Sequence, residues 1–136
     1  MARRATIRRR KALVQEAERV VRARYAEFDL SLADVAESVG TSSRELQRAF
    51  REEADTEFRT VLVQVRVDAA CRLLSRKRTG VTVRAAARSV GFRGPSGLGA
   101  AFRRVYGQPP SAFQPEPPEY LGTLDEPAHV PPVELD

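Results

Sequence analysis

The stretch from residue 43 to residue 50 carries side chains that could bind the edges of DNA bases. If this stretch is helical, its apolar residues Leu46, Ala49 and Phe50 lie on one face, since they are three and four positions apart. The opposite face then carries three polar residues, Arg44, Gln47 and Arg48. Arg and Gln can form paired hydrogen bonds with guanine and adenine in the major groove. A solvated helix face is the alternative interpretation, because charged helix faces are common.

A turn that contains glycine separates this stretch from a shorter helical pattern. Ser31 has the type and position of a helix N-cap, and Asp34 follows in the first turn. Gly40 is expected to end that helix, because glycine readily adopts the left-handed conformation of a C-cap. An N-cap signal lies in the turn at residues 40–42, and the next helix extends to about residue 54. A short helix, a turn and a second helix form the helix-turn-helix motif.

The same pattern occurs a second time further along the chain. Residues 81–91 align with residues 30–40, and residues 98–103 align with residues 46–51 after one extra residue in the turn. An internal repeat of this kind indicates one supersecondary unit that is built twice. The spacing of apolar residues predicts a long helix from residue 58 to about residue 78, which joins the two copies.

Charge is distributed unevenly along the 136 residues, a length that suits one domain or two very small ones sharing a helix. Residues 115–136 hold six acids and no Lys or Arg, so residues 1–114 carry 23 basic against 12 acidic side chains. That excess attracts polyanions, of which nucleic acid is the commonest. Six of the nine prolines also lie in residues 115–136, which we predict to be a disordered tail. It is either a solubilising terminus or an acidic mimic of phosphate that folds back on the basic face.

Residues 1–10 contain five arginines and no acid. This segment is predicted to be a solvated basic arm that precedes a helix from about residue 11 to residue 25. In a basic DNA-binding protein, such an arm can also lie along phosphates or enter the minor groove.

No pattern of residues predicts catalysis. His129 is the only histidine and lies in the tail, Cys71 is the only cysteine, and no glycine-rich phosphate loop follows a strand. We therefore expect no enzymatic activity, no cofactor and no metal site. A single cysteine excludes a disulfide framework and favours a reducing compartment. No apolar run reaches the length of a membrane span and no signal peptide is evident, so we expect a cytoplasmic protein.

Several ordered stretches of the sequence resemble the DNA-binding domain of the AraC/XylS family. They are residues 32–36 with 46–50, residues 66–74, and residues 90–92 with 101–107 and 110–113. The resemblance covers about residues 10–114. It implies an all-α fold of about seven helices, in which two helix-turn-helix subdomains are joined by a long central helix.

The resemblance and the composition together divide the chain into five segments. They are the basic arm at 1–10, an N-terminal helix and the first helix-turn-helix unit at 11–57, a linker helix at 58–79, the second unit at 80–114 and the acidic tail at 115–136. No segment corresponds to an effector domain. The sequence is therefore similar to the short, single-domain family members, which bind asymmetric sites as monomers, and a homodimer stays open as the alternative.

The resemblance implies a nucleoid-associated transcription regulator that binds double-stranded promoter DNA, with RNA polymerase as a further candidate partner. The second helix of each unit would enter one of two adjacent major grooves, about 34 Å apart. The residues expected to contact DNA in the first unit are Ser43, Arg44, Gln47, Arg48 and Arg51. Those expected to contact DNA in the second unit are Arg93, Ser96, Arg103 and Arg104.

The second of these helices departs from the family pattern. It carries Gly97, Gly99 and Ala100 at outward positions where family members usually have polar or basic side chains, although Pro95 suits a first turn. We hypothesise that the first unit reads most of the base sequence, whereas the second mainly contacts phosphates. A packing role for the two glycines is the alternative. The competing functions are a nonspecific architectural DNA-binding protein and a protein-interaction module acting on RNA polymerase or another regulator.

Overall fold

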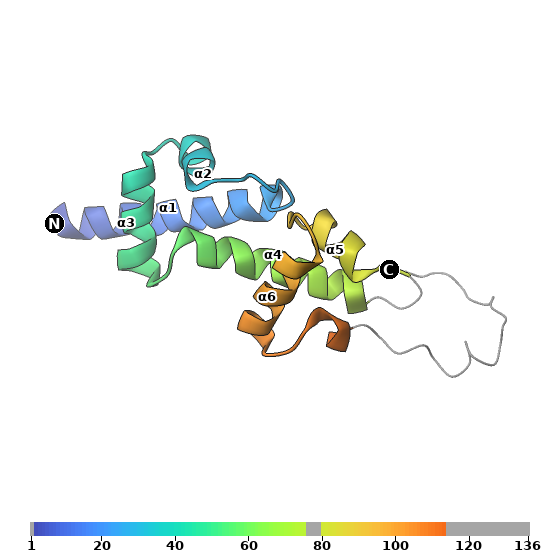
Figure 1. Ribbon diagram of the computed structural model, residues 1–136. Coiled ribbons are helices and arrows are strands. Elements are labelled where there is room, and N and C mark those ends of the chain that lie inside the picture. Colours follow the sequence, from blue (N-terminus) through green and yellow to red (C-terminus); the bar gives the residue numbers. More distant parts are fainter. Residues whose placement is uncertain (1, 76–79, 114–136) are drawn as a thin grey trace, which may run out of the picture. The chain divides into compact units, whose positions relative to one another are not determined.

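The computed structural model describes residues 2–75 and 80–113, and these residues fold into helices alone (Figure 1). The elements are α1 (Ala2–Arg24), α2 (Leu32–Val39), α3 (Ser43–Ala54), α4 (Phe58–Ser75), α5 (Val83–Ser89), α6 (Pro95–Tyr106) and the 3-10 helix η1 (Pro110–Phe113). The predicted all-α class is confirmed, and the seventh helix of the prediction is the short η1. None of the described helices is long and apolar enough to cross a membrane.

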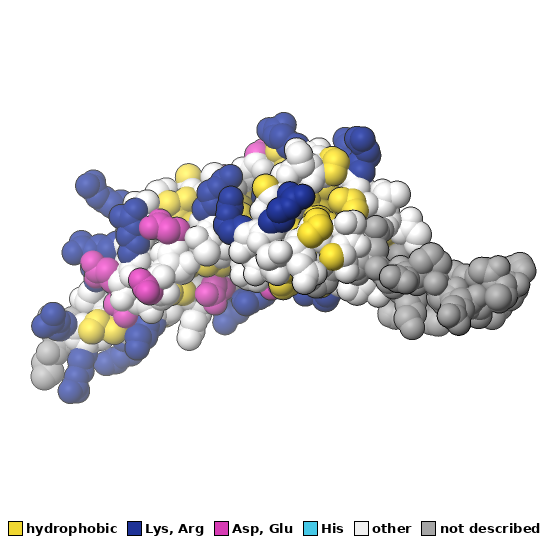
Figure 2. Space-filling view, turned by 60° about the horizontal axis from the view of Figure 1, so that its bottom comes forward, with side chains coloured by type: hydrophobic (Ala, Val, Ile, Leu, Met, Phe, Trp, Pro, Cys, Tyr) yellow, Lys and Arg dark blue, Asp and Glu magenta, His cyan; other side chains and the backbone are white. Residues whose placement is uncertain are grey.

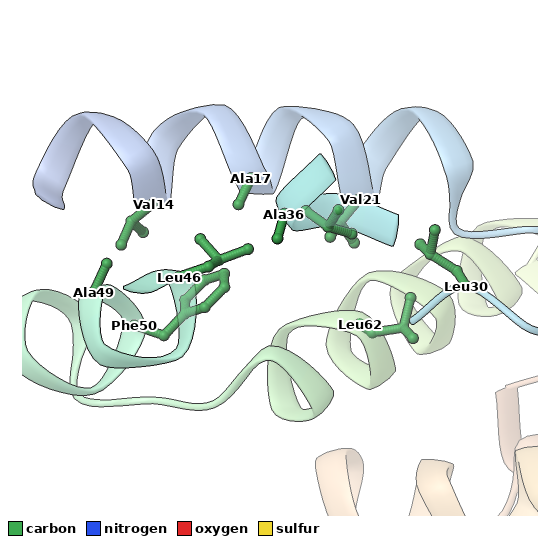
Figure 3. Packing of buried hydrophobic residues seen from close by; sticks show 10 residues of the cluster. Val14, Ala17, Val21, Leu30, Ala36, Leu46, Ala49, Phe50 and Leu62 are labelled. Atoms are coloured by element: carbon green, nitrogen blue, oxygen red, sulfur yellow. The ribbon is translucent and has the colours of Figure 1, made fainter. Parts of the chain in front are cut away.

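The chain divides into two compact units, Met1–Arg66 and Val67–Asp136, and the boundary falls within α4. The core of unit 1 forms where α1, α2, α3 and the first half of α4 meet. Figure 3 shows Leu46 and Phe50 of α3 directed toward the side of α1 that carries Ala17. These three side chains are fully buried. Because burying a large apolar side chain contributes about 1.5–3 kcal/mol, this contact fixes the rotation of α3 about its own axis.

Local caps set the turn between α2 and α3. The Ser31 hydroxyl accepts a hydrogen bond from the Asp34 amide, and the Asp34 carboxylate accepts one from the Ser31 amide, both at 3.1 Å. Gly40 ends α2 with a φ of 79°, in the left-handed region that glycine tolerates. The Ser42 hydroxyl then accepts a hydrogen bond from the Glu45 amide at the start of α3. The predicted caps at these positions are confirmed.

A buried arginine holds the loop between α1 and α2 in place. Arg66 of α4 donates hydrogen bonds to the backbone carbonyls of Tyr25 and Glu27, at 2.8 and 2.7 Å. Only 7% of the surface of Arg66 is exposed to solvent, and this burial lowers the pKa of its guanidinium. The two carbonyls supply the acceptors that a buried cation needs.

Unit 2 builds its core from α5, α6 and the second half of α4. The buried side chains of α6 are Leu98, Ala101 and Phe102. Pro95 occupies the first turn of α6, as predicted, and Gly107 ends the helix with a φ of 74°. The Tyr106 hydroxyl donates a 2.6 Å hydrogen bond to the Asp68 carboxylate, which ties α6 to α4 within this unit.

Of three predictions for the chain ends and for the end of α4, one needs correction and two lie outside the described residues. The prediction that residues 1–10 form a solvated arm ahead of the first helix was wrong, because α1 begins at Ala2 and the described part of this segment is helical. Arg, Lys and Ala are strong helix formers. In addition, the ion pairs of Arg9 and Arg10 with Glu45 hold the N-terminal part of α1 against α3. The predicted continuation of α4 over residues 76–78 and the acidic tail at 115–136 lie outside the described residues.

Candidate nucleic-acid interface

The outer face of α3 presents its polar side chains to solvent. Arg44, Arg48 and Arg51 are exposed, and Gln47 is half-buried. With Ser42, Glu45 and Glu52, they line a shallow groove along the helix. Within residues 2–75 and 80–113, the side chains of Arg44 and Gln47 form no hydrogen bond or ion pair with the protein. Both are therefore available to an external ligand without breaking an internal contact.

Arg48 and Arg51 differ from Arg44 because each already has an acidic partner. Arg48 Nε lies 3.3 Å from Glu52 Oε2, and Arg51 Nε lies 3.0 Å from Glu57 Oε2. Both pairs are more than 45% exposed, and exposed pairs of this kind contribute about 0–1 kcal/mol. Either arginine can therefore turn to a DNA ligand at a small free-energy cost.

A network of ion pairs connects the side of α3 to α1. Arg10 Nε lies 3.3 Å from Glu45 Oε2, and Arg10 Nη1 lies 2.7 Å from Glu52 Oε1. Glu52 thus joins Arg10 to Arg48, because its other carboxylate oxygen accepts from Arg48. Sequence reasoning missed this network. The signal was available in the spacing of Glu45 and Glu52, which lie two turns apart on one side of α3.

Basic side chains gather around the N-terminal end of α1, with acidic side chains on the neighbouring surface (Figure 2).

The five residues predicted in the first unit, including the half-buried Ser43, all lie on α3. The structure therefore brings the predicted first-unit residues together on one helix.

The predicted residues of the second unit lie on or just before α6. Ser96 is exposed in the first turn, Arg103 and Arg104 are exposed in the last turns, and Arg93 is exposed two residues ahead of the helix. Gly94 is the N-cap and forms no side-chain hydrogen bond to the helix. The amide groups at the start of α6 therefore lack a side-chain cap.

The glycines of α6 are not required by close packing. A Cβ atom built on Gly97 would meet the Phe92 ring at 3.4 Å, and one built on Gly99 would meet Arg103 Nη1 at 3.8 Å. Both distances are ordinary van der Waals contacts. Gly97 and Ala100 are exposed and Gly99 is half-buried. The outer surface of α6 between Ser96 and Arg103 is consequently smooth and nearly free of hydrogen-bonding side chains.

Comparison with known proteins identifies the family. Residues 35–116 match the model of a family described as a helix-turn-helix domain, which is more than half of the chain. The chain belongs to the AraC-type helix-turn-helix family. This family comprises DNA-binding domains of transcription factors.

Relatives of known name support this assignment. The transcriptional activator NphR of Rhodococcus sp is 31% identical over 99 residues, which are 73% of this chain and 29% of that protein. A probable AraC family transcriptional regulator from Rhodopseudomonas palustris is 26% identical, with a TM-score of 0.68 over 76% of this chain and 99% of that one. The DNA-binding domain of AdpA, solved in complex with a target DNA, is 26% identical, with a TM-score of 0.65 over 82% of this chain and 96% of that one.

Proposed function

We propose that this AraC-type domain regulates transcription from promoters and that α3 carries most of its base recognition, whereas α6 mainly contacts phosphates. The observation that carries the proposal is the contrast between the outer faces of the two helices. The outer face of α3 presents Arg44, Gln47 and Arg48, whereas the outer face of α6 presents Gly97 and Ala100.

The side chains of α3 suit direct readout of bases. An arginine can donate two hydrogen bonds to guanine, and a glutamine can pair with adenine, each contact contributing about 1–3 kcal/mol of discrimination. Arg44 and Gln47 are not engaged by the described part of the protein, and Arg48 leaves an exposed pair with Glu52 at small cost. Three neighbouring side chains on the outer face of α3 can therefore select bases.

The side chains around α6 suit contacts that position the domain on the duplex. Arg103 and Arg104 are exposed cations at one end of α6. At the other end, the amides after Gly94 lack a side-chain cap, and such helix N-termini favour phosphate. Contacts with phosphates fix register and orientation but carry no sequence information. In this proposal α3 and α6 enter successive major grooves of one site, and one copy of the domain suffices.

Substitutions on the two helices should have different effects. Arg44→Ala or Arg48→Ala should remove about 1–3 kcal/mol of preference for a base at one position and leave the other positions unchanged. Arg103→Ala should weaken binding to all duplexes alike and lower the salt slope by about one. Competition binding against duplexes with single base-pair changes measures both effects. A uniform loss in the α3 variants, or a change of base preference in Arg103→Ala, would contradict the division of roles.

The smooth face of α6 and the basic N-terminal half of α1 favour a second function, a nonspecific architectural DNA-binding protein. That function predicts equal affinity for promoter and random duplexes and a steep loss of affinity with salt. The same competition experiment distinguishes it, because a specific regulator prefers its selected duplex over a random one at every salt concentration.

A further inference from the structure

We propose that the first turns of α1 form a second DNA-contacting surface, which lies against the phosphate backbone at one edge of the major groove that α3 occupies. The overhang, as we call residues 2–8 of α1, precedes the two arginines that bind the side of α3. This inference rests on the proposed role of α3 as the base-reading helix and adds a contact outside both helix-turn-helix motifs.

Ion pairs fix the direction in which the overhang leaves α3. Arg10 continues the apolar stripe of α1 that contains Val14 and Ala17, and its side chain is only 14% exposed. It bridges Glu45 and Glu52, which lie two turns apart along α3. A second pair, from Arg9 to Glu45 at 3.4 Å, lies beside it. Three ion pairs to two carboxylates therefore hold α1 across the side of α3 as a continuous helix.

The dimensions of a DNA groove place a phosphate strand beside the overhang. Figure 1 shows α1 crossing α3 and its N-terminal end projecting past it. Packed helices lie about 8–10 Å apart. The major groove is about 8.5 Å deep and 12 Å wide. With α3 in the groove, the phosphates at its edge rise to about the level of α1. Seven residues of α-helix extend about 10 Å, which exceeds half the width of the groove.

The charges of the overhang lack partners within the described part of the protein. Arg3, Arg4 and Arg8 are exposed and form no ion pair with residues 2–75 or 80–113, and no acid lies in the first turn of α1. Cations at a helix N-terminus oppose the helix dipole, so these charges destabilise the isolated helix end. A polyanion relieves that repulsion, and DNA phosphates at the edge of the groove supply it.

In the C-terminal half of α1, by contrast, the arginines have acidic partners. Arg19 pairs with Glu16 at 2.7 Å, and Arg22 lies 4.0 Å from Glu18. Basic side chains are thus paired with acids toward the C-terminal end of the helix. Within the described residues, the arginines of α1 that form no ion pair are Arg3, Arg4 and Arg8 of the overhang, where the proposal places the phosphate strand.

The test compares R3Q/R4Q with the matched control R19Q/R22Q. Each variant removes two charges from the same helix, and glutamine keeps helix propensity close to that of arginine. The probe is the duplex that the unsubstituted protein selects from a random pool, in a long form and in forms trimmed on either side of the site. Binding is measured from about 50 to 200 mM salt, and circular dichroism melting confirms that both variants fold.

The proposal predicts a specific pattern. R3Q/R4Q should lower the salt slope by about two and weaken binding at least tenfold near 0.1 M salt, without changing base preference, while R19Q/R22Q should lower the slope less. Trimming the duplex on the side reached by the overhang should abolish the difference between R3Q/R4Q and the unsubstituted protein.

Equal effects of the two variants would overturn the proposal, as would a change of base preference in R3Q/R4Q. An unchanged salt slope in R3Q/R4Q would also overturn it, because the two arginines would then make no contact with phosphates. These failures leave the role of α3 intact, provided that the unsubstituted protein still selects a duplex. Failure to select any duplex would overturn both the role of α3 and that of the overhang.

Discussion

Replacing Gly99 with alanine should stabilise unit 2. Gly99 lies in the interior of α6, and its φ is not among the positive values of the described glycines. Glycine in a helix interior is less favourable than alanine by about 0.5–1 kcal/mol, because it loses more conformational freedom on folding. The substitution therefore removes an entropic cost without changing the course of the backbone.

The local geometry shows that the added methyl group fits. The nearest atom to a Cβ at Gly99 would be Arg103 Nη1 at 3.8 Å, which is the far end of a flexible and exposed side chain. The full gain of about 0.5–1 kcal/mol is therefore expected. The same change at Gly97 should give a smaller gain, because its Cβ would meet the more constrained Phe92 ring at 3.4 Å.

Thermal and urea unfolding followed by circular dichroism measure this effect, and Gly107→Ala is the matched control. Gly107 ends the same helix with a φ of 74°, in the left-handed region where alanine costs about 1–2 kcal/mol. For a small domain, about 1 kcal/mol corresponds to a change of about 4–8 °C in Tm. Gly99→Ala should thus raise Tm and Gly107→Ala should lower it.

The signs of the Tm changes in Gly99→Ala and Gly107→Ala test the reasoning. An unchanged or lower Tm in Gly99→Ala would refute the claim that space and backbone conformation leave this position free for a side chain. DNA affinity supplies a second readout, because a methyl group on a surface that approaches DNA closely should weaken binding even as stability rises.

Two further predictions concern hydrogen bonds that hold each unit together. Arg66→Met should destabilise the protein by about 3 kcal/mol, since two charge-assisted bonds to carbonyls are lost, whereas the exposed Arg59→Met should have nearly no effect in the same urea titration. Tyr106→Phe should cost about 1 kcal/mol at neutral pH through loss of the bond to Asp68. That bond raises the pKa of Tyr106, so its stabilisation is complete below about pH 10 and declines as the pH rises further. Unfolding of Tyr106→Phe should lack this decline, and an identical alkaline profile in both proteins would rule out the bond as its source.

The sequence predicted those features of the fold that depend on nearby residues. Ser31, Gly40 and Ser42 act within one turn of helix, so their types and positions were sufficient to place the caps. The register of α3 followed from the spacing of Leu46 and Phe50. For this reason, the exposed positions of the candidate site could be predicted before the structure was known.

Contacts between distant residues explain what the sequence did not predict. The helical start of α1 depends on Arg9 and Arg10 meeting Glu45, which lies 36 and 35 residues away. Arg66 was expected to be one polar residue of a long helix, because its partners are backbone carbonyls that no residue pattern reveals. Long-range pairing and backbone acceptors appear only once the helices are packed.

Selection of bound duplexes from a random pool tests the central claim most directly, because it reports the length of the site and the information at each base pair. The division of roles between α3 and α6 predicts one half-site with strongly preferred bases and an adjacent half-site, about one helical turn away, with little preference. Equal information in the two half-sites would contradict the claim that Arg44, Gln47 and Arg48 carry most of the base recognition.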